Sequence, residues 1–255
     1  MTFDPGILWA PLVAGLLVTA THAPLGMQVL NRGIVFIDLA VAQIAGLGVI
    51  FADWLGHEPQ GVAVQAAALT AALAGALLLN WTEKLWPDVQ EAVIGVTFIV
   101  AANAAILLLA VNPRGAEHLK DLLIGQILWV RSAQLPILGL LSAAILAVWF
   151  GLRGRMGRSA FYLVFACAVT LSVQLVGLYL VFATLIVPAL ATRRLSRGRL
   201  AACYAIGAAG YAAGLFASAI TDLPAGPLIV CVMALLGMVL MVGTSRSAVH
   251  RRERV

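Results

Sequence analysis

Residues 34–52 read IVFIDLAVAQIAGLGVIFA, a nearly continuous apolar run that carries two strongly polar side chains, Asp38 and Gln43. The length of the run is close to the roughly 20 residues with which an α-helix crosses a bilayer. An ionisable group inside such a helix costs several kcal/mol unless protein or water shields it from lipid. We therefore predict that Asp38 faces a packed interior or a water-filled path. The alternative is that Asp38 lies near the membrane surface, where headgroup water hydrates it.

The composition predicts an all-α, polytopic membrane protein. Hydrophobic residues make up 62% of the chain and charged residues 11%, whereas a soluble domain has about 25% charged residues. The apolar stretches are continuous and do not alternate at every second residue, which excludes an outer-membrane barrel. The net charge of +5 does not indicate a nucleic-acid partner, because most basic residues lie in loops next to the apolar segments. We expect residues 1–255 to form a single transmembrane domain in a lipid bilayer.

Nine apolar segments follow one another along the chain. We expect about eight or nine transmembrane helices, with a turn near Gly177 that separates two of them. The segments are centred in 7–24, 33–53, 62–80, 92–112, 133–152, 159–176, 178–192, 200–220 and 226–244.

Three arginine clusters indicate the orientation, because cytoplasmic loops of membrane proteins are enriched in Lys and Arg. All three lie on one side only if the region 159–192 crosses the membrane twice. This predicts an inner-membrane protein with its N-terminus outside and its C-terminus in the cytoplasm. Loops 81–91 and 113–131 fit the orientation less well, since the first is acidic and the second carries basic residues on the outer side. The clusters are Arg153, Arg155 and Arg158; Arg193, Arg194, Arg197 and Arg199; and Arg246, Arg251, Arg252 and Arg254.

Segment 116–130, AEHLKDLLIGQILWV, differs from the others. Its apolar residues recur at helical spacing, and its charged residues lie off that face. We predict a short amphipathic helix at the membrane surface or against the bundle.

Catalytic and nucleotide-binding motifs are absent from the sequence. There is no G-x-x-x-x-G-K-[ST] phosphate loop, and the chain has only two lysines, Lys84 and Lys120. The sequence also contains no H-E-x-x-H motif and no paired-cysteine spacing. We therefore expect neither an enzyme nor a bound cofactor. Energy for uphill transport would come from a partner subunit or from an ion gradient.

Four stretches carry a family resemblance. The first is GMQVLNRGIVFID at 26–38, in which a glycine, a short apolar stretch and an arginine precede the aspartate. The others are DLLIGQILW at 121–129, QLVGLYLVFATLIVPALAT at 174–192 and DLPAGPLI at 222–229. In this order they resemble the membrane subunits of binding-protein-dependent ABC importers of the zinc and manganese type.

The resemblance implies a permease that pairs with a second copy of itself as a homodimer. A cytoplasmic ATP-binding subunit would drive it, so that ATP hydrolysis lies on a separate chain. An extracytoplasmic binding protein would deliver the transported divalent cation, Zn²⁺ or Mn²⁺. The residues that we expect along the path are Asp38 and Gln43.

The chain departs from the family at the position four residues after Asp38. The family usually has a histidine there, and this chain has Ala42. Gln43 is one residue further and lies about 140° around an ideal helix from Asp38. It shares a face with Asp38 only if the helix is broken or overwound, which Gly46 and Gly48 would allow. Without this imidazole the chain lacks the usual borderline metal ligand, so the sequence does not determine which metal ion is transported.

A second departure concerns the segment that couples such permeases to the ATPase. The acidic family pattern is replaced by the short, basic segment GLRGRMGRS at 151–159. We predict that Arg153, Arg155 and Arg158 form a shortened docking element. The alternative is an ordinary positively charged cytoplasmic loop.

Two other classes of function stay open at this stage. A secondary, ion-coupled transporter would use Asp38 as its proton or cation relay. A membrane scaffold would use Asp38 only as a polar contact between helices. Partnership with an ATPase distinguishes the importer from both.

Overall fold

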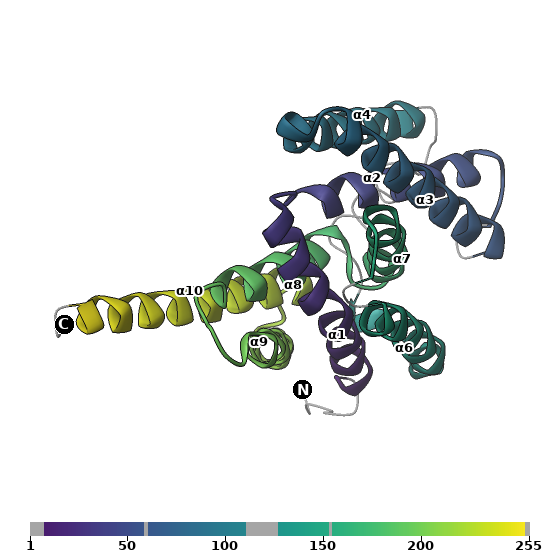
Figure 1. The fold of residues 1–255 in the computed structure, drawn as a ribbon. Coiled ribbons are helices and arrows are strands. Elements are labelled where there is room, and N and C mark those ends of the chain that lie inside the picture. The colour runs from purple at the N-terminus through teal and green to yellow at the C-terminus, as the bar shows by residue number, and fades with distance from the viewer. Residues whose placement is uncertain (1–7, 59–60, 111–126, 153–154, 253–255) are drawn as a thin grey trace. The chain divides into compact units, whose positions relative to one another are not determined.

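The computed structural model describes residues 8–58, 61–110, 127–152 and 155–252, and every regular element in these ranges is a helix (Figure 1). This confirms the all-α prediction. The nine α-helices are α1 Trp9–Arg32, α2 Ile37–Trp54, α3 Val62–Leu85, α4 Gln90–Ala110, α6 Leu135–Gly151, α7 Arg158–Val176, α8 Leu178–Ala191, α9 Arg199–Thr221 and α10 Ala225–Arg252. Short 3₁₀ turns lie at η2 Pro87–Val89, η3 Ile127–Trp129 and η4 Ser132–Gln134.

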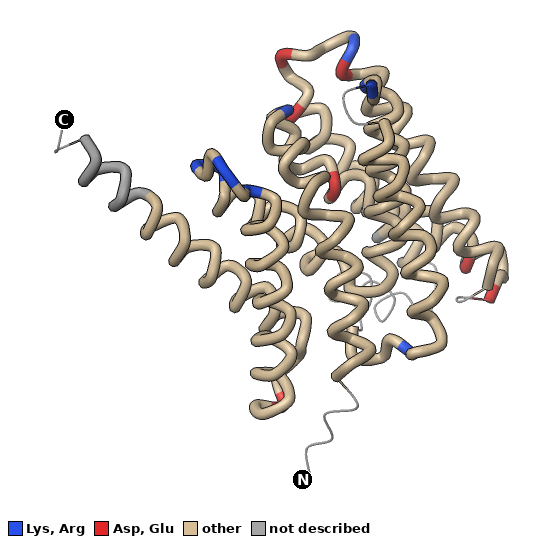
Figure 2. The backbone as a smooth tube through the Cα atoms, turned by 60° about the horizontal axis from the view of Figure 1, so that its bottom comes forward, with Lys and Arg blue, Asp and Glu red and all other residues tan. Residues whose placement is uncertain are grey.

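Seven helical segments in the described part of the chain are long and apolar enough to cross a membrane. A further apolar helix, α8, is shorter than these. Figure 2 shows that the charged residues gather near helix ends and in the turns between helices. The candidate spans are Trp9–Arg32, Ile37–Trp54, Val62–Leu85, Ser132–Gly151, Arg158–Val176, Arg199–Thr221 and Ala225–Thr244.

The predicted turn near Gly177 is present between α7 and α8. Gly177 has φ 84° and ψ 161°, a backbone conformation that a side chain disfavours, and its amide closes the last turn of α7. The break lets the apolar region 159–192 form two helices, as the positions of the arginine clusters predicted. The predicted amphipathic helix at 116–130 lies largely outside the described residues, and only its end is seen, as η3.

The chain divides into two compact units. Unit 1 comprises residues 1–31, 126–142 and 179–255, and unit 2 comprises residues 32–125 and 143–178. That residues 1–255 act as one permease domain stays a prediction.

Unit 1 is packed through glycines that let helices approach closely. A methyl group at Gly26 of α1 would overlap the carbonyl oxygen of Leu185 in α8. A methyl group at Gly214 of α9 would lie 2.5 Å from the Cα of Ile229 in α10. Gly26 and Gly214 therefore allow the close packing of α1 on α8 and of α9 on α10.

Unit 2 places α2 against α3, α4 and α7 (Figure 1). Gly48 of α2 packs against the backbone of α3, where a Cβ would lie 2.7 Å from the carbonyl oxygen of Ala67. Aromatic rings of α7 fill the interior of the unit, and Phe161, Tyr162 and Phe165 are fully buried. Asp38 lies in the first turn of α2 and is buried in this unit.

Candidate functional site

Asp38 lies in the first turn of α2 and is completely buried. Neither of its carboxylate oxygens has a hydrogen-bond partner of good geometry among the described residues. A buried carboxyl without a full partner is costly, so this side chain is available for a cation or a proton.

Gln43 does not share the face of Asp38. Helix α2 runs without interruption from Ile37 to Trp54, so the two side chains project about 140° apart. The glycines that could have broken the helix serve packing: Gly46 is buried, and Gly48 contacts α3. Gln43 is half-buried on another side of the helix.

Glu91, in the first turn of α4, is a second carboxyl at the start of α2. Its Oε1 accepts a hydrogen bond of 3.2 Å from the amide of Phe36, the residue that caps α2. Its Oε2 is buried without a partner among the described residues. Glu91 also acts electrostatically on Asp38 as a like charge. From sequence, Glu91 is one of several acidic residues in loop 81–91. Glu91 directly precedes the apolar segment 92–112, and this position could have indicated a carboxyl at the end of a membrane helix.

His22, in α1 of unit 1, is another buried ionisable residue, and it was not among the predicted site residues. Its Nδ1 lies 3.0 Å from the carbonyl oxygen of Val18 and 3.0 Å from Oγ1 of Thr21. If Nδ1 donates to the Val18 carbonyl, Nε2 carries the lone pair, and that atom has no partner among the described residues. The available signal was an imidazole inside the apolar segment 7–24.

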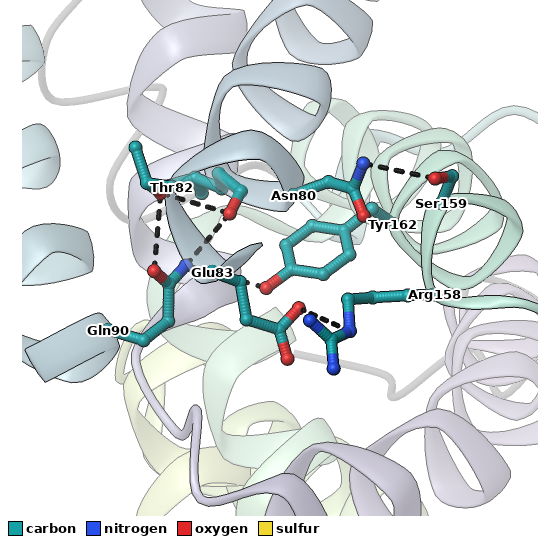
Figure 3. Close-up of polar contacts among 8 residues, drawn as sticks. Asn80, Thr82, Glu83, Gln90, Arg158, Ser159 and Tyr162 are labelled. Atoms are coloured by element: carbon teal, nitrogen blue, oxygen red, sulfur yellow. Dashed lines mark hydrogen bonds and ion pairs between the residues drawn. The ribbon is translucent and has the colours of Figure 1, made fainter. Parts of the chain in front are cut away.

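The predicted coupling segment is described in part. Arg158 begins α7, and its Nε lies 3.5 Å from Oε2 of Glu83 at the end of α3 (Figure 3). The next residue, Ser159, accepts a hydrogen bond of 3.0 Å from Nδ2 of Asn80. Arg155 is exposed, and Arg153 lies outside the described residues. The structure therefore joins Arg158 to the end of α3 and leaves Arg155 free for solvent or a partner.

The described residues contain no ready-made metal centre, since no group of three or more His, Cys, Asp or Glu side chains among them could hold a metal ion. What the start of α2 offers is the buried carboxyl of Asp38, with Glu91 holding the helix end beside it. Carboxyl oxygens are donors that hard divalent cations accept.

Comparison with known proteins gives a family match along nearly the whole chain. The sequence model described as the ABC 3 transport family matches residues 5–161 and 147–244. The match includes Asp38, Glu91 and the segment that precedes α7.

Two solved structures share the fold. The structure of PsaBC from Streptococcus pneumoniae in complex with Fab superposes with a TM-score of 0.74 at 20% identity, covering 92% of this chain and 90% of that chain. A structure described as an inward-facing conformation of a metal-chelate type ABC transporter gives a TM-score of 0.70 at 15% identity. It covers 91% of this chain and 85% of the other chain.

Proposed function

We propose, because this chain belongs to the ABC 3 transport family, that it is the permease subunit of an ATP-driven importer for divalent metal ions of the zinc or manganese type. It would work as a homodimer in the inner membrane, with its C-terminus in the cytoplasm. A separate cytoplasmic subunit would hydrolyse ATP, and an extracytoplasmic binding protein would supply the cation.

The family match carries the importer assignment, and the observation that carries the proposed cation path is the state of Asp38. Its carboxyl is fully buried in an apolar helix, and both oxygens are without hydrogen-bond partners among the described residues. Such a group is expensive to maintain inside a membrane protein, and ion and proton pathways are where it is found. Carboxylate oxygens suit hard and borderline divalent cations.

Asp38 would replace part of the hydration shell of the passing ion with its carboxyl oxygens. Gln43, which projects from another side of α2, would be a polar group on a separate part of the path. Closure of the ATP-binding subunits would rock the two permease copies and open the path to the other side, as in alternating access. The exposed Arg155, together with Arg153 and Arg158, would receive the ATPase.

The test is cation uptake by vesicles that contain the reconstituted permease, its ATP-binding subunit and its binding protein. We expect ATP-dependent accumulation of radioactive zinc or manganese by the wild type and loss of accumulation by Asp38→Asn. Asp222→Asn is the matched control, because Asp222 is exposed at a helix end with φ 56°, a conformation that asparagine also adopts.

Three outcomes would contradict parts of the proposal. A wild type that accumulates no divalent cation with ATP present would refute the function. Uptake that depends on a proton gradient and proceeds without ATP would favour the secondary carrier. Normal uptake by Asp38→Asn would remove this residue from the path while leaving the importer assignment intact.

A further inference from the structure

Two consecutive residues at the start of α4, Gln90 and Glu91, contact different parts of unit 2. The buried amide of Gln90 donates through Nε2 to the carbonyl oxygen of Leu79 at 2.9 Å. Nε2 also lies 3.5 Å from the hydroxyl oxygen of Tyr162, and Oε1 accepts a hydrogen bond of 3.2 Å from Thr82 (Figure 3). Gln90 thus joins the end of α3 to the first turns of α7.

The beginning of α7 is held at two more points. Arg158 pairs with Glu83, and Ser159 accepts a hydrogen bond from Asn80, so both side chains are tied to the last turn and a half of α3. The connector between α6 and α7 ends directly before Arg158. Short polar contacts therefore join the start of α7 to the end of α3, directly before the α3–α4 turn.

Glu91 extends these contacts to α2. Its Oε1 accepts the amide hydrogen of Phe36 at 3.2 Å, and Asp38 follows two residues later in the first turn of the same helix. Because Gln90 and Glu91 are adjacent in a helix, the contact with α7 and the contact with α2 move as one body. All of these residues lie within unit 2.

We propose that Gln90 and Glu91 are positioning residues that link the α6–α7 connector to Asp38. Displacement of the connector by the ATP-binding subunit shifts the first turn of α7, and the Gln90–Glu91 step transmits that shift to the start of α2. The inference rests on the proposed importer function. Glutamine suits this position because one amide both donates and accepts, which lets it hold α3 and α7 together.

The experiment measures cation uptake and ATP hydrolysis together in the reconstituted full complex. Gln90→Met and Glu91→Leu keep side-chain bulk and remove the polar contacts. We expect both variants to assemble and to hydrolyse ATP, but to transport about tenfold fewer ions per ATP, in the range of measured coupling energies. Tyr162→Phe removes one hydroxyl and should give a smaller loss in the same direction.

A conservative variant separates positioning from direct cation binding. Glu91→Gln keeps an oxygen that accepts the Phe36 amide but loses the negative charge. We expect Glu91→Gln to retain most of the ions transported per ATP. The matched controls are Gln65→Met and Glu58→Leu, since both side chains are exposed and outside these contacts.

Each contrary result identifies what is wrong. Unchanged transport per ATP in Gln90→Met and Glu91→Leu would overturn the link while the wild type still transports. A Glu91→Gln variant as defective as Glu91→Leu would show that the charge matters, and would overturn the positioning role. Loss of ATPase binding in Gln90→Met and Tyr162→Phe would reduce these residues to structural ones. A wild type without cation uptake would refute the proposed function itself.

Discussion

The two units of the chain consist of similar apolar helices, but different groups hold them together. In unit 1, glycines let helices come into close contact. Buried hydrogen bonds between uncharged side chains add to this packing. The hydroxyls of Thr184 and Tyr211 lie 3.0 Å apart, and Oγ1 of Thr192 lies 3.0 Å from Sγ of Cys203. Asp222 is the one acidic residue in the described part of unit 1, and it is exposed.

In unit 2, three acidic side chains take part in the helix packing or lie beside it, whereas others, such as Glu58 and Asp88, are exposed. Asp38 is buried, Glu91 holds the start of α2, and Glu83 pairs with Arg158. Close packing through small residues stabilises helix pairs in a membrane. Burying an ionisable group there costs free energy, and such groups are commonly functional. The difference supports placing the proposed cation path and coupling contacts in unit 2.

The largest expected effect breaks the packing of unit 1. Gly26→Ala places a methyl group against the carbonyl oxygen of Leu185, which is backbone and cannot rotate away. We expect a destabilisation of about 3 kcal/mol, or failure to fold. The apparent melting temperature of the purified protein in detergent measures it.

Gly139→Ala is the control for that substitution. Gly139 also lies in a helix of unit 1, but a Cβ there meets nothing within 4 Å. Alanine should raise the stability by up to about 1 kcal/mol, because it has the higher helix propensity. Equal losses for the two variants would mean that close approach does not hold unit 1 together.

The next largest effect concerns Asp38, the buried carboxyl of unit 2. Asp38→Asn replaces a carboxylate that lacks good hydrogen bonds by a neutral side chain of the same shape. We expect this variant to melt higher than the wild type, by the equivalent of about 1 kcal/mol or more, while transport is lost. An unchanged or lower melting temperature would indicate that the protein satisfies this carboxyl, which would weaken the contrast between the units.

Sequence patterns predicted the helices well because hydropathy and turn residues are local signals. The nine apolar segments correspond to the nine described α-helices, and Gly177 separates α7 from α8. Asp38 stood out because a charge within a long apolar run is visible without any tertiary information.

The contacts of the candidate site were less accessible from sequence. Glu91 meets Phe36 across 55 positions, and no periodicity connects residues so far apart. A glycine such as Gly48 occurs both in broken helices and in closely packed ones. Only the position of α3 shows that Gly48 allows close packing. The pairing of Arg158 with Glu83 was likewise hidden, because an arginine at a helix start is typical of any cytoplasmic loop.

A smaller effect tests the uncharged contacts of unit 1. Tyr211→Phe removes the hydroxyl that lies 3.0 Å from Thr184 and leaves the buried ring in place. We expect a loss of about 1 kcal/mol in stability, with transport unaffected once the protein is folded. Tyr179→Phe is the control, since Tyr179 is exposed and should change the melting temperature little. A transport defect in folded Tyr211→Phe would show that this contact of unit 1 also affects transport, against the proposal that the cation path lies in unit 2.

The smallest effect on stability is expected for the ion pair of Arg158 and Glu83. The arginine side chain is 47% exposed, so water screens the pair and its coupling energy should be about 0.5 kcal/mol. A double-mutant cycle of Arg158→Ala and Glu83→Ala, followed by melting temperature, measures this energy. The same cycle followed by ions transported per ATP should give a larger, non-additive effect, because the pair connects α7 to the α3–α4 turn. An equally small coupling energy in both measurements would make the pair an ordinary surface contact. Glu83 and Arg158 would then have no part in the proposed coupling, and Asp38 and Glu91 would remain as the acidic residues that distinguish unit 2.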